Sequence, residues 1–246
     1  LGDCISLGIS WYLQKYSEKK RDSRYTYGYA RFSILSALIS AIVLISGSIF
    51  ILTKAIPRLF DPVMPDTSGM IWLALLGILF NGAAALRIGR GRSLNEQMVS
   101  WHLFEDVIGW VGVLVIGIIM KYYHVPILDG LFSILFTLFI LFNVTKVLRE
   151  TLKILLQGRP DDLDTGNLIE DLQQIPNIIS SHDLRIWIMD EAQVMMTVHL
   201  VGPDLSSKQD IIEIKSQVSA IAEKHRIAHV TTELEYADET CKLSQT

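Results

Sequence analysis

Four long apolar segments dominate the first part of the chain. Each is long enough for an α-helix to cross roughly 30 Å of hydrocarbon. The segments are Ala30–Ile56, Met70–Ile88, a more mixed Met98–Met120, and Pro126–Leu148. The pattern therefore predicts four complete membrane-spanning helices.

A fifth apolar segment, Leu1–Leu13, is too short to span a bilayer. It has no initiator methionine, basic flank or cleavage site, so the pattern is not typical of a signal peptide. We interpret it as the second half of a helix whose start precedes residue 1.

Basic residues alternate from loop to loop between these segments. Lysine and arginine near helix ends stay preferentially on the cytoplasmic side of a membrane. The segment Lys15–Arg31 is rich in them, Pro57–Gly69 contains Arg58 alone, and the loop near Lys121 again holds a single one. Further basic groups, on the same side as Lys15–Arg31, are Arg87, Arg90 and Arg92, and then Lys146, Arg149, Lys153 and Arg159. This alternation places the C-terminal part of the chain in the cytoplasm.

From Pro160 onward the apolar positions follow the periods of a small soluble domain. Helical spacing, strand alternation and turn residues divide this part into five elements. They are a helix over Leu163–Gln174, strands over His182–Met189 and Gln193–Val201, a helix over Ser206–His225 capped by Ser206 or Ser207, and a strand over Val230–Tyr236. The order α-β-β-α-β predicts an α+β domain with both helices on one face of a sheet. We expect a membrane domain over residues 1–158 and a cytoplasmic domain over residues 159–246.

Composition and charge agree with this division. Half of the 246 residues are apolar, which is too many for an ordinary soluble chain. Residues 1–158 contain 15 basic and 10 acidic residues, whereas residues 159–246 contain 7 and 16, a net charge of −9. The composition excludes a disordered tail and argues against a nucleic-acid partner. Cys4 and Cys241 lie at opposite ends of the chain, so they predict neither a disulfide framework nor a paired-cysteine zinc site.

His102 and Asp106 lie inside the third complete span. Residues four apart share one face of a helix, so both side chains can point at one spot. An aspartate inside a membrane costs roughly 2.5–3.5 kcal/mol and normally faces a partner or a water-filled cavity. A divalent cation suits an imidazole and a carboxylate, and a hydrogen-bonded pair that fastens two helices is the alternative. Asp3, the one charged residue of the first apolar segment, favours the metal, because carboxylates from two helices can meet at a site between them.

These residues resemble the cation diffusion facilitator family, in its zinc-exporting branch. The resemblance rests on the His102/Asp106 pair followed by Gly109 and Gly112, and on Asp3 as the remnant of a second such pair. It also includes Arg24-Tyr25-Thr26-Tyr27-Gly28, Asn81, Asp129 and the soluble segment His182-Asp183-Leu184-Arg185-Ile186-Trp187. It implies a bundle of six membrane helices, of which four and part of the second fall within this chain, followed by a cytoplasmic ferredoxin-like domain. The first helix and the other half of the second would precede residue 1.

A second metal site is predicted on the cytoplasmic sheet. Strand alternation puts His199 on the face away from the helices, together with Glu233 and Glu235. The resemblance adds His182, which starts the first strand where the family often has a ligand. The alternative is a solvated polar sheet face. Arg185 stands where many relatives have a second histidine, and Cys241 is either a soft ligand from the tail or a surface thiol.

Taken with the resemblance, these features predict a secondary transporter rather than an enzyme. We expect it to export divalent cations, zinc first, with Cd²⁺, Co²⁺, Fe²⁺ and Mn²⁺ as other candidates, in exchange for protons. The transport site would be Asp3, His102 and Asp106, and the second site His182, His199, Glu233 and Glu235. We expect a homodimer in the lipid bilayer, namely a bacterial inner membrane, without a prosthetic group. The competing hypothesis is a membrane-anchored metal sensor or assembly subunit, for which the intramembrane ligands would be unnecessary.

Overall fold

The computed structural model describes residues 2–88, 94–190, 192–203, 207–239 and 241, with side chains described for most of them. The chain divides into two compact units, residues 42–145 and residues 1–41 together with 146–246. Each unit is described by itself.

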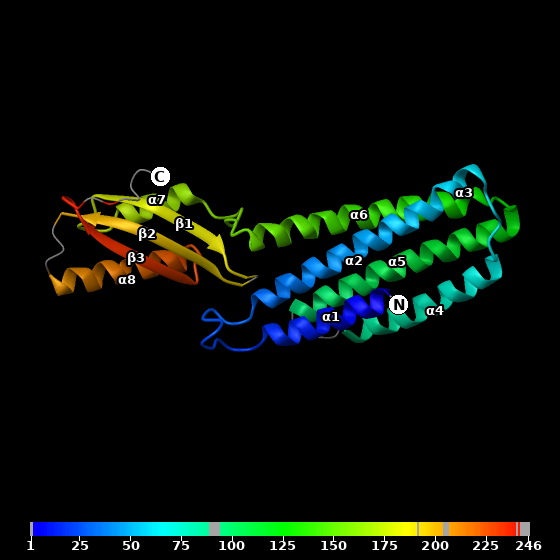
Figure 1. Ribbon diagram of the computed structural model, residues 1–246, viewed down its shortest axis with the longest axis horizontal. Coiled ribbons are helices and arrows are strands. Elements are labelled where there is room, and N and C mark those ends of the chain that lie inside the picture. The colour runs from blue at the N-terminus through cyan, green and yellow to red at the C-terminus, as the bar shows by residue number, and fades with distance from the viewer. Residues whose placement is uncertain (1, 89–93, 191, 204–206, 240, 242–246) are drawn as a thin grey trace. The chain divides into compact units, whose positions relative to one another are not determined.

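The apolar segments of the sequence form helices at the predicted places (Figure 1). They are α2 over Arg31–Ala55, α4 over Thr67–Ile88, α5 over Leu94–Tyr123 and α6 over Ile127–Leu155. Among the described residues, these four helices are long and apolar enough to cross a membrane. The shorter helices are α1 over Gly2–Ser17 and α3 over Pro57–Phe60. Helices α5 and α6 continue past the predicted ends, because hydropathy detects the part of a helix that faces lipid and not the polar turns that extend it.

Small residues let the membrane helices approach closely within the unit 42–145. A Cβ atom at Gly112 would lie 2.5 Å from the ring of Phe132, and one at Gly109 would lie 2.5 Å from the ring of Phe136. Both contacts join α5 to α6, and Gly77 of α4 likewise lies against the ring of Trp110 in α5. Such contacts hold helices together in lipid, where apolar burial alone gives little driving force.

The cytoplasmic domain has the predicted order α-β-β-α-β (Figure 1). Its elements are α7 over Thr165–Gln173, β1 over Ser180–Ile188, β2 over Val194–Gly202, α8 over Lys208–Lys224 and β3 over His229–Tyr236. The side chain of Asp164 caps α7, and Ser207 caps α8 as the sequence predicts. The sheet has the order β1-β2-β3, with β1 antiparallel to β2 and β2 parallel to β3.

Both helices of this domain pack on one face of the sheet. The core consists of Met196, Val198 and Leu200 of β2 with residues of α7 and α8, among them Leu168, Leu172, Ile214 and Val218, all almost fully buried. The alternate residues of β2, including Thr197 and His199, therefore lie on the opposite face, as the alternation predicts. This packing fixes which side chains of the sheet can bind a ligand.

Candidate metal centre

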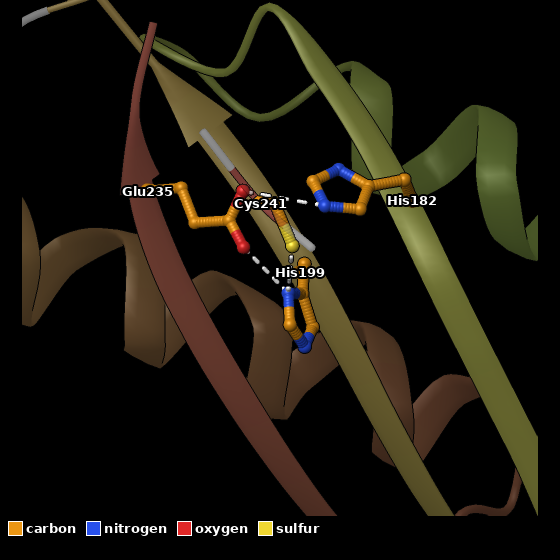
Figure 2. Close-up of side chains that lie close together, drawn as sticks. All are labelled: His182, His199, Glu235 and Cys241. Carbon is orange, nitrogen blue, oxygen red and sulfur yellow. Dashed lines mark hydrogen bonds and ion pairs between the residues drawn. The ribbon is translucent and has the colours of Figure 1, made fainter. Parts of the chain in front are cut away.

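Four potential metal ligands meet on the face of the sheet away from the helices. They are His182 of β1, His199 of β2, Glu235 of β3 and Cys241 beyond β3, each of which offers one ligand atom within 4.8 Å of the others (Figure 2). The pairing of the strands produces this arrangement, because His182 lies opposite His199, and Glu235 lies two residues beyond Glu233, the partner of His199 in β3. Three hydrogen-bonded strands thus hold three of the four groups.

A β-bulge brings His182 to this face. Asp183 and Leu184 together lie opposite one residue of β2, so the regular alternation of β1 is interrupted between His182 and Arg185. Leu184, Ile186 and Ile188 pack toward the core, and a regular strand would have turned His182 in that direction as well. Asp183 has a positive φ of 47°, a conformation that aspartate adopts more readily than most residues. The bulge is therefore the local feature that creates the site.

His199 is buried between carboxylates on its two sides. Its Nδ1 lies 2.5 Å from Oε1 of Glu235, and its Nε2 lies 3.4 Å from Oε2 of Glu233 and 3.8 Å from Oδ2 of Asp183. The two nitrogens of an imidazole point in different directions, so one ion cannot bind both. Glu235 and Glu233 consequently belong to opposite sides of the ring. The Nε2 side opens onto a hollow of about 710 Å³ that Asp183, Arg185, Thr231 and Glu233 help to line.

Glu235 is almost fully buried, with 4% of its surface exposed. Burial is the largest influence on its pKa and opposes ionisation, yet hydrogen bonds from His199 and Cys241 and the nearby His182 hold the pKa below its usual value. The site thus keeps a carboxylate ionised in a place where desolvation would otherwise protonate it. Ionised carboxylate is the form that binds a metal ion.

The second histidine of the group, His182, has a buried ring nitrogen that makes no hydrogen bond with the described residues. Nε2 of His182 lies 3.2 Å from Oε2 of Glu235, but it makes no hydrogen bond with any residue that the structure describes. Buried polar atoms are normally paired, and an exception calls for a specific cause such as a bound ion. Two imidazoles, a carboxylate and a thiol together form a ligand set that suits zinc and other thiophilic ions.

The predicted transport-site residues occupy two of the membrane-part helices. Asp3 lies in α1, and His102 and Asp106 lie in α5, which runs without interruption through both positions. The side chains of Asp3 and His102 lie outside the described residues, whereas the side chain of Asp106 is half-buried. The predicted Asp3, His102 and Asp106 site therefore stays a prediction.

The predicted cytoplasmic residues fall into two groups. The structure brings His182, His199 and Glu235 together and places Glu233 on the other side of the His199 ring, with 67% of its side chain exposed. Arg185 binds the carboxylate of Asp183 at 2.9 Å instead of joining the ligand group. Asp183 is a residue that strand alternation could not identify, because its position depends on the bulge. Cys241 lies beyond β3, so strand alternation cannot predict where its side chain points.

Comparison with known proteins agrees with the fold. Helices long enough to span a membrane, joined to an α+β domain with a group of potential metal ligands, point to a class of membrane protein that handles metal ions. The cation efflux transmembrane domain matches residues 1–156, and the cytoplasmic domain of cation efflux proteins matches residues 160–237. The chain therefore belongs to the cation diffusion facilitator family. It is an integral membrane cation efflux protein whose C-terminal domain is cytoplasmic.

Bacterial relatives resemble the chain along nearly its whole length. The metal cation efflux system protein CzcD of Cupriavidus metallidurans is 30% identical over 239 residues, which cover 96% of this chain and 75% of that protein. A cadmium, cobalt and zinc/H(+)-K(+) antiporter of Bacillus subtilis is 28% identical, over 96% of this chain and 77% of the relative. The zinc transporter ZitB of Pectobacterium atrosepticum is 29% identical, over 100% of this chain and 78% of the relative.

Proposed function

We propose that this protein exports zinc from the cytoplasm in exchange for protons, across a bacterial inner membrane. Membership in the cation diffusion facilitator family supports export, and the relatives whose names mention zinc support that ion. Cadmium and cobalt, which the antiporter's name also mentions, are the next candidates. A purely sensing or anchoring role gains no support from these relatives.

The proposed transport site consists of Asp3, His102 and Asp106. The observation that carries it is the unbroken helix α5 through the His-x-x-x-Asp pair, which is the condition for the two residues to act on one ion. A metal ion binds neutral imidazole and ionised carboxylate, so its binding displaces any protons on these groups. Histidine has an ordinary pKa of about 6.5, so physiological pH differences suffice to exchange metal for protons. Rocking of the helices around the site would then give alternating access.

The proposed cytoplasmic site consists of His182, His199 and Glu235, with Glu233 close to the other side of the His199 ring. Its support is the buried Nε2 of His182, which makes no hydrogen bond with any described residue and lies 3.2 Å from Oε2 of Glu235. We assign this site a regulatory role in a domain over residues 159–246. The family description of residues 160–237 names a dimer, so we place a homodimer contact within residues 163–236.

Transport by proteoliposomes tests the proposed function. Vesicles that contain the chain are given an inward or an outward pH gradient, and zinc uptake is followed with a fluorescent indicator. The proposal requires zinc movement whose direction follows the proton gradient. Zinc fluxes equal to those of protein-free vesicles under both gradients would contradict it.

A double variant separates the regulatory site from the transport site. His199→Ala with Glu233→Ala should leave maximal transport intact and raise the zinc concentration at which half of it is reached. His229→Ala is the matched control, because this exposed histidine at the start of β3 lies outside the ligand group. An unchanged half-saturating concentration in the double variant would remove the regulatory role.

A further inference from the structure

Cys241, which follows β3, approaches the ligand group that the three strands hold. Its Sγ lies 3.7 Å from Nδ1 of His199 (Figure 2). Nδ1 is the nitrogen that faces Glu235, so the thiol and the carboxylate share one side of the imidazole. Glu233, the residue that the sequence suggests as an additional ligand, faces the opposite nitrogen. Among the side chains that the structure describes, Cys241 and not Glu233 is therefore placed to give a fourth ligand to the same ion.

Two of the separations within this group are close to those within a tetrahedral zinc site. Zinc bonds of about 2.3 Å to sulfur and about 2.0–2.1 Å to nitrogen or oxygen separate a sulfur and a nitrogen ligand by about 3.5 Å, and two nitrogen or oxygen ligands by about 3.3 Å. The observed separations are 3.7 Å for Cys241 and His199, and 3.2 Å for His182 and Glu235. Only the hydrogen-bonded His199 and Glu235 pair, at 2.5 Å, is tighter than a bound ion would allow. An ion that enters would replace this hydrogen bond.

We propose that Cys241 is the fourth ligand of the cytoplasmic site, which makes it a tetrahedral His₂-Glu-Cys centre selective for thiophilic ions. This inference rests on the proposed regulatory site and specifies its chemistry. The site would bind Zn²⁺, Cd²⁺ and Co²⁺ and discriminate against Mn²⁺ and Mg²⁺, because a thiolate is a soft ligand. It would also bind the end of the chain to all three strands of the domain.

Cobalt spectroscopy of the full chain in detergent tests the assignment. A thiolate bound to Co²⁺ gives a sulfur-to-metal charge-transfer band in the near ultraviolet, which imidazole and carboxylate ligands do not give. We expect this band in the parent and its loss in Cys241→Ser. Cys4→Ser is the matched control and should keep the band, because Cys4 is the other cysteine of the chain. No such band in the parent, or its persistence in Cys241→Ser, would overturn the assignment.

His199→Ala separates the failure of this inference from the failure of the proposed site. One outcome is that the parent binds cobalt without the near-ultraviolet sulfur band, and that its visible cobalt bands are lost in His199→Ala. That result would support the cytoplasmic site and exclude Cys241 as its ligand. If His199→Ala changes no cobalt band at all, both the regulatory site and the thiolate ligand are rejected.

Metal selectivity gives a second readout. Loss of an outer-shell partner weakens metal binding by about 10–100-fold, so the loss of a direct ligand should weaken Cd²⁺ binding at the cytoplasmic site by at least about tenfold. Mn²⁺ binding should change much less in Cys241→Ser.

A third test leaves Cys241 in place and measures the rate at which this thiol is alkylated, with mass spectrometry as the readout. Zinc should slow it in the parent and not in His199→Ala, and equal rates with and without zinc in the parent would contradict the proposal.

Discussion

The membrane helices and the cytoplasmic domain arrange their apolar residues in opposite ways. In α4 the large side chains point outward, with 69% of Trp72 and 62% of Leu79 exposed, while small residues such as Ala74 are buried. In the cytoplasmic domain Leu168 and Leu200 are fully buried, and the polar side chains occupy the outer face of the sheet. Lipid solvates apolar side chains, so helices in a membrane bury small residues, whereas water drives the largest ones inside.

This difference determines where each unit can hold a polar site. In the cytoplasmic domain the apolar core occupies one face of the sheet, so polar ligands collect on the other face, and strand pairing sets the distances between them. In the membrane unit a polar ligand must lie between helices, and helix packing sets those distances. A ligand on a strand is therefore placed by its own sheet, while a ligand on a membrane helix depends on neighbours far away in the sequence.

The largest expected effect tests the functional side of this comparison. His102→Ala should abolish zinc transport in proteoliposomes, because it removes the imidazole of the proposed transport site. His124→Asn is the control, since His124 follows α5 with a φ of 51° that asparagine tolerates. A transport rate in His102→Ala equal to that of the parent would move the transport site elsewhere. His102→Asp should shift the preference from zinc toward Mn²⁺, since oxygen ligands favour harder ions.

The next effect concerns stability and uses the same substitution in both units. Leu200→Ala should destabilise the cytoplasmic domain by about 2–5 kcal/mol, because it leaves a cavity in a fully packed core. Leu79→Ala should have little effect, because most of that side chain faces outward from α4. Thermal unfolding of the purified chain, followed by circular dichroism, measures both. Equal losses in the two variants would contradict the contrast in packing.

A smaller effect is expected when a small residue is replaced by a larger one. Gly112→Ala places a methyl group against the ring of Phe132, and overpacking of this kind typically costs about 1–3 kcal/mol. Gly47→Ala is the control, because a Cβ atom at Gly47 meets no atom within 4 Å. The temperature at which each variant aggregates in detergent should fall for Gly112→Ala and stay level for Gly47→Ala. The reverse order would show that α5 and α6 pack differently.

The smallest effect is a pH dependence in the cytoplasmic domain. Lys224 and His225 at the end of α8 bind the carboxylate of Asp171 in α7, and these hydrogen bonds hold the pKa of Asp171 below its usual value of 3.8. A lowered carboxylate pKa stabilises the fold above the unfolded-state value, and this stability is lost as the pH falls through the folded-state value. Asp171→Asn should thus unfold at a lower temperature than the parent near neutral pH, and the gap should narrow below about pH 4. The exposed Asp162 provides a control as Asp162→Asn, and a gap independent of pH would exclude this linkage.

The sequence predicts most of the fold because its signals are periodic. Four apolar segments predict α2, α4, α5 and α6, and alternation predicts the strands and the face on which His199 lies. Strand alternation cannot predict the bulge at Asp183, since a bulge interrupts the period on which the method relies. It also cannot place Cys241, whose position depends on the course of the chain after β3. The predicted meeting of Asp3 with His102 and Asp106 would depend on packing between helices, and periodicity carries no information about such packing.

The bulge in β1 has a consequence for how this site can be lost. Deleting the single codon for Asp183 would leave every ligand codon intact, yet it would restore the regular alternation of β1. His182 would then directly precede the core-facing Leu184, so it would stay opposite His199 on the outer face of the sheet. A residue added between His182 and Arg185 without a second bulge would instead turn His182 toward the core. A homologue that keeps all four ligand residues but lacks the inserted residue would, by this reasoning, keep the geometry of the centre.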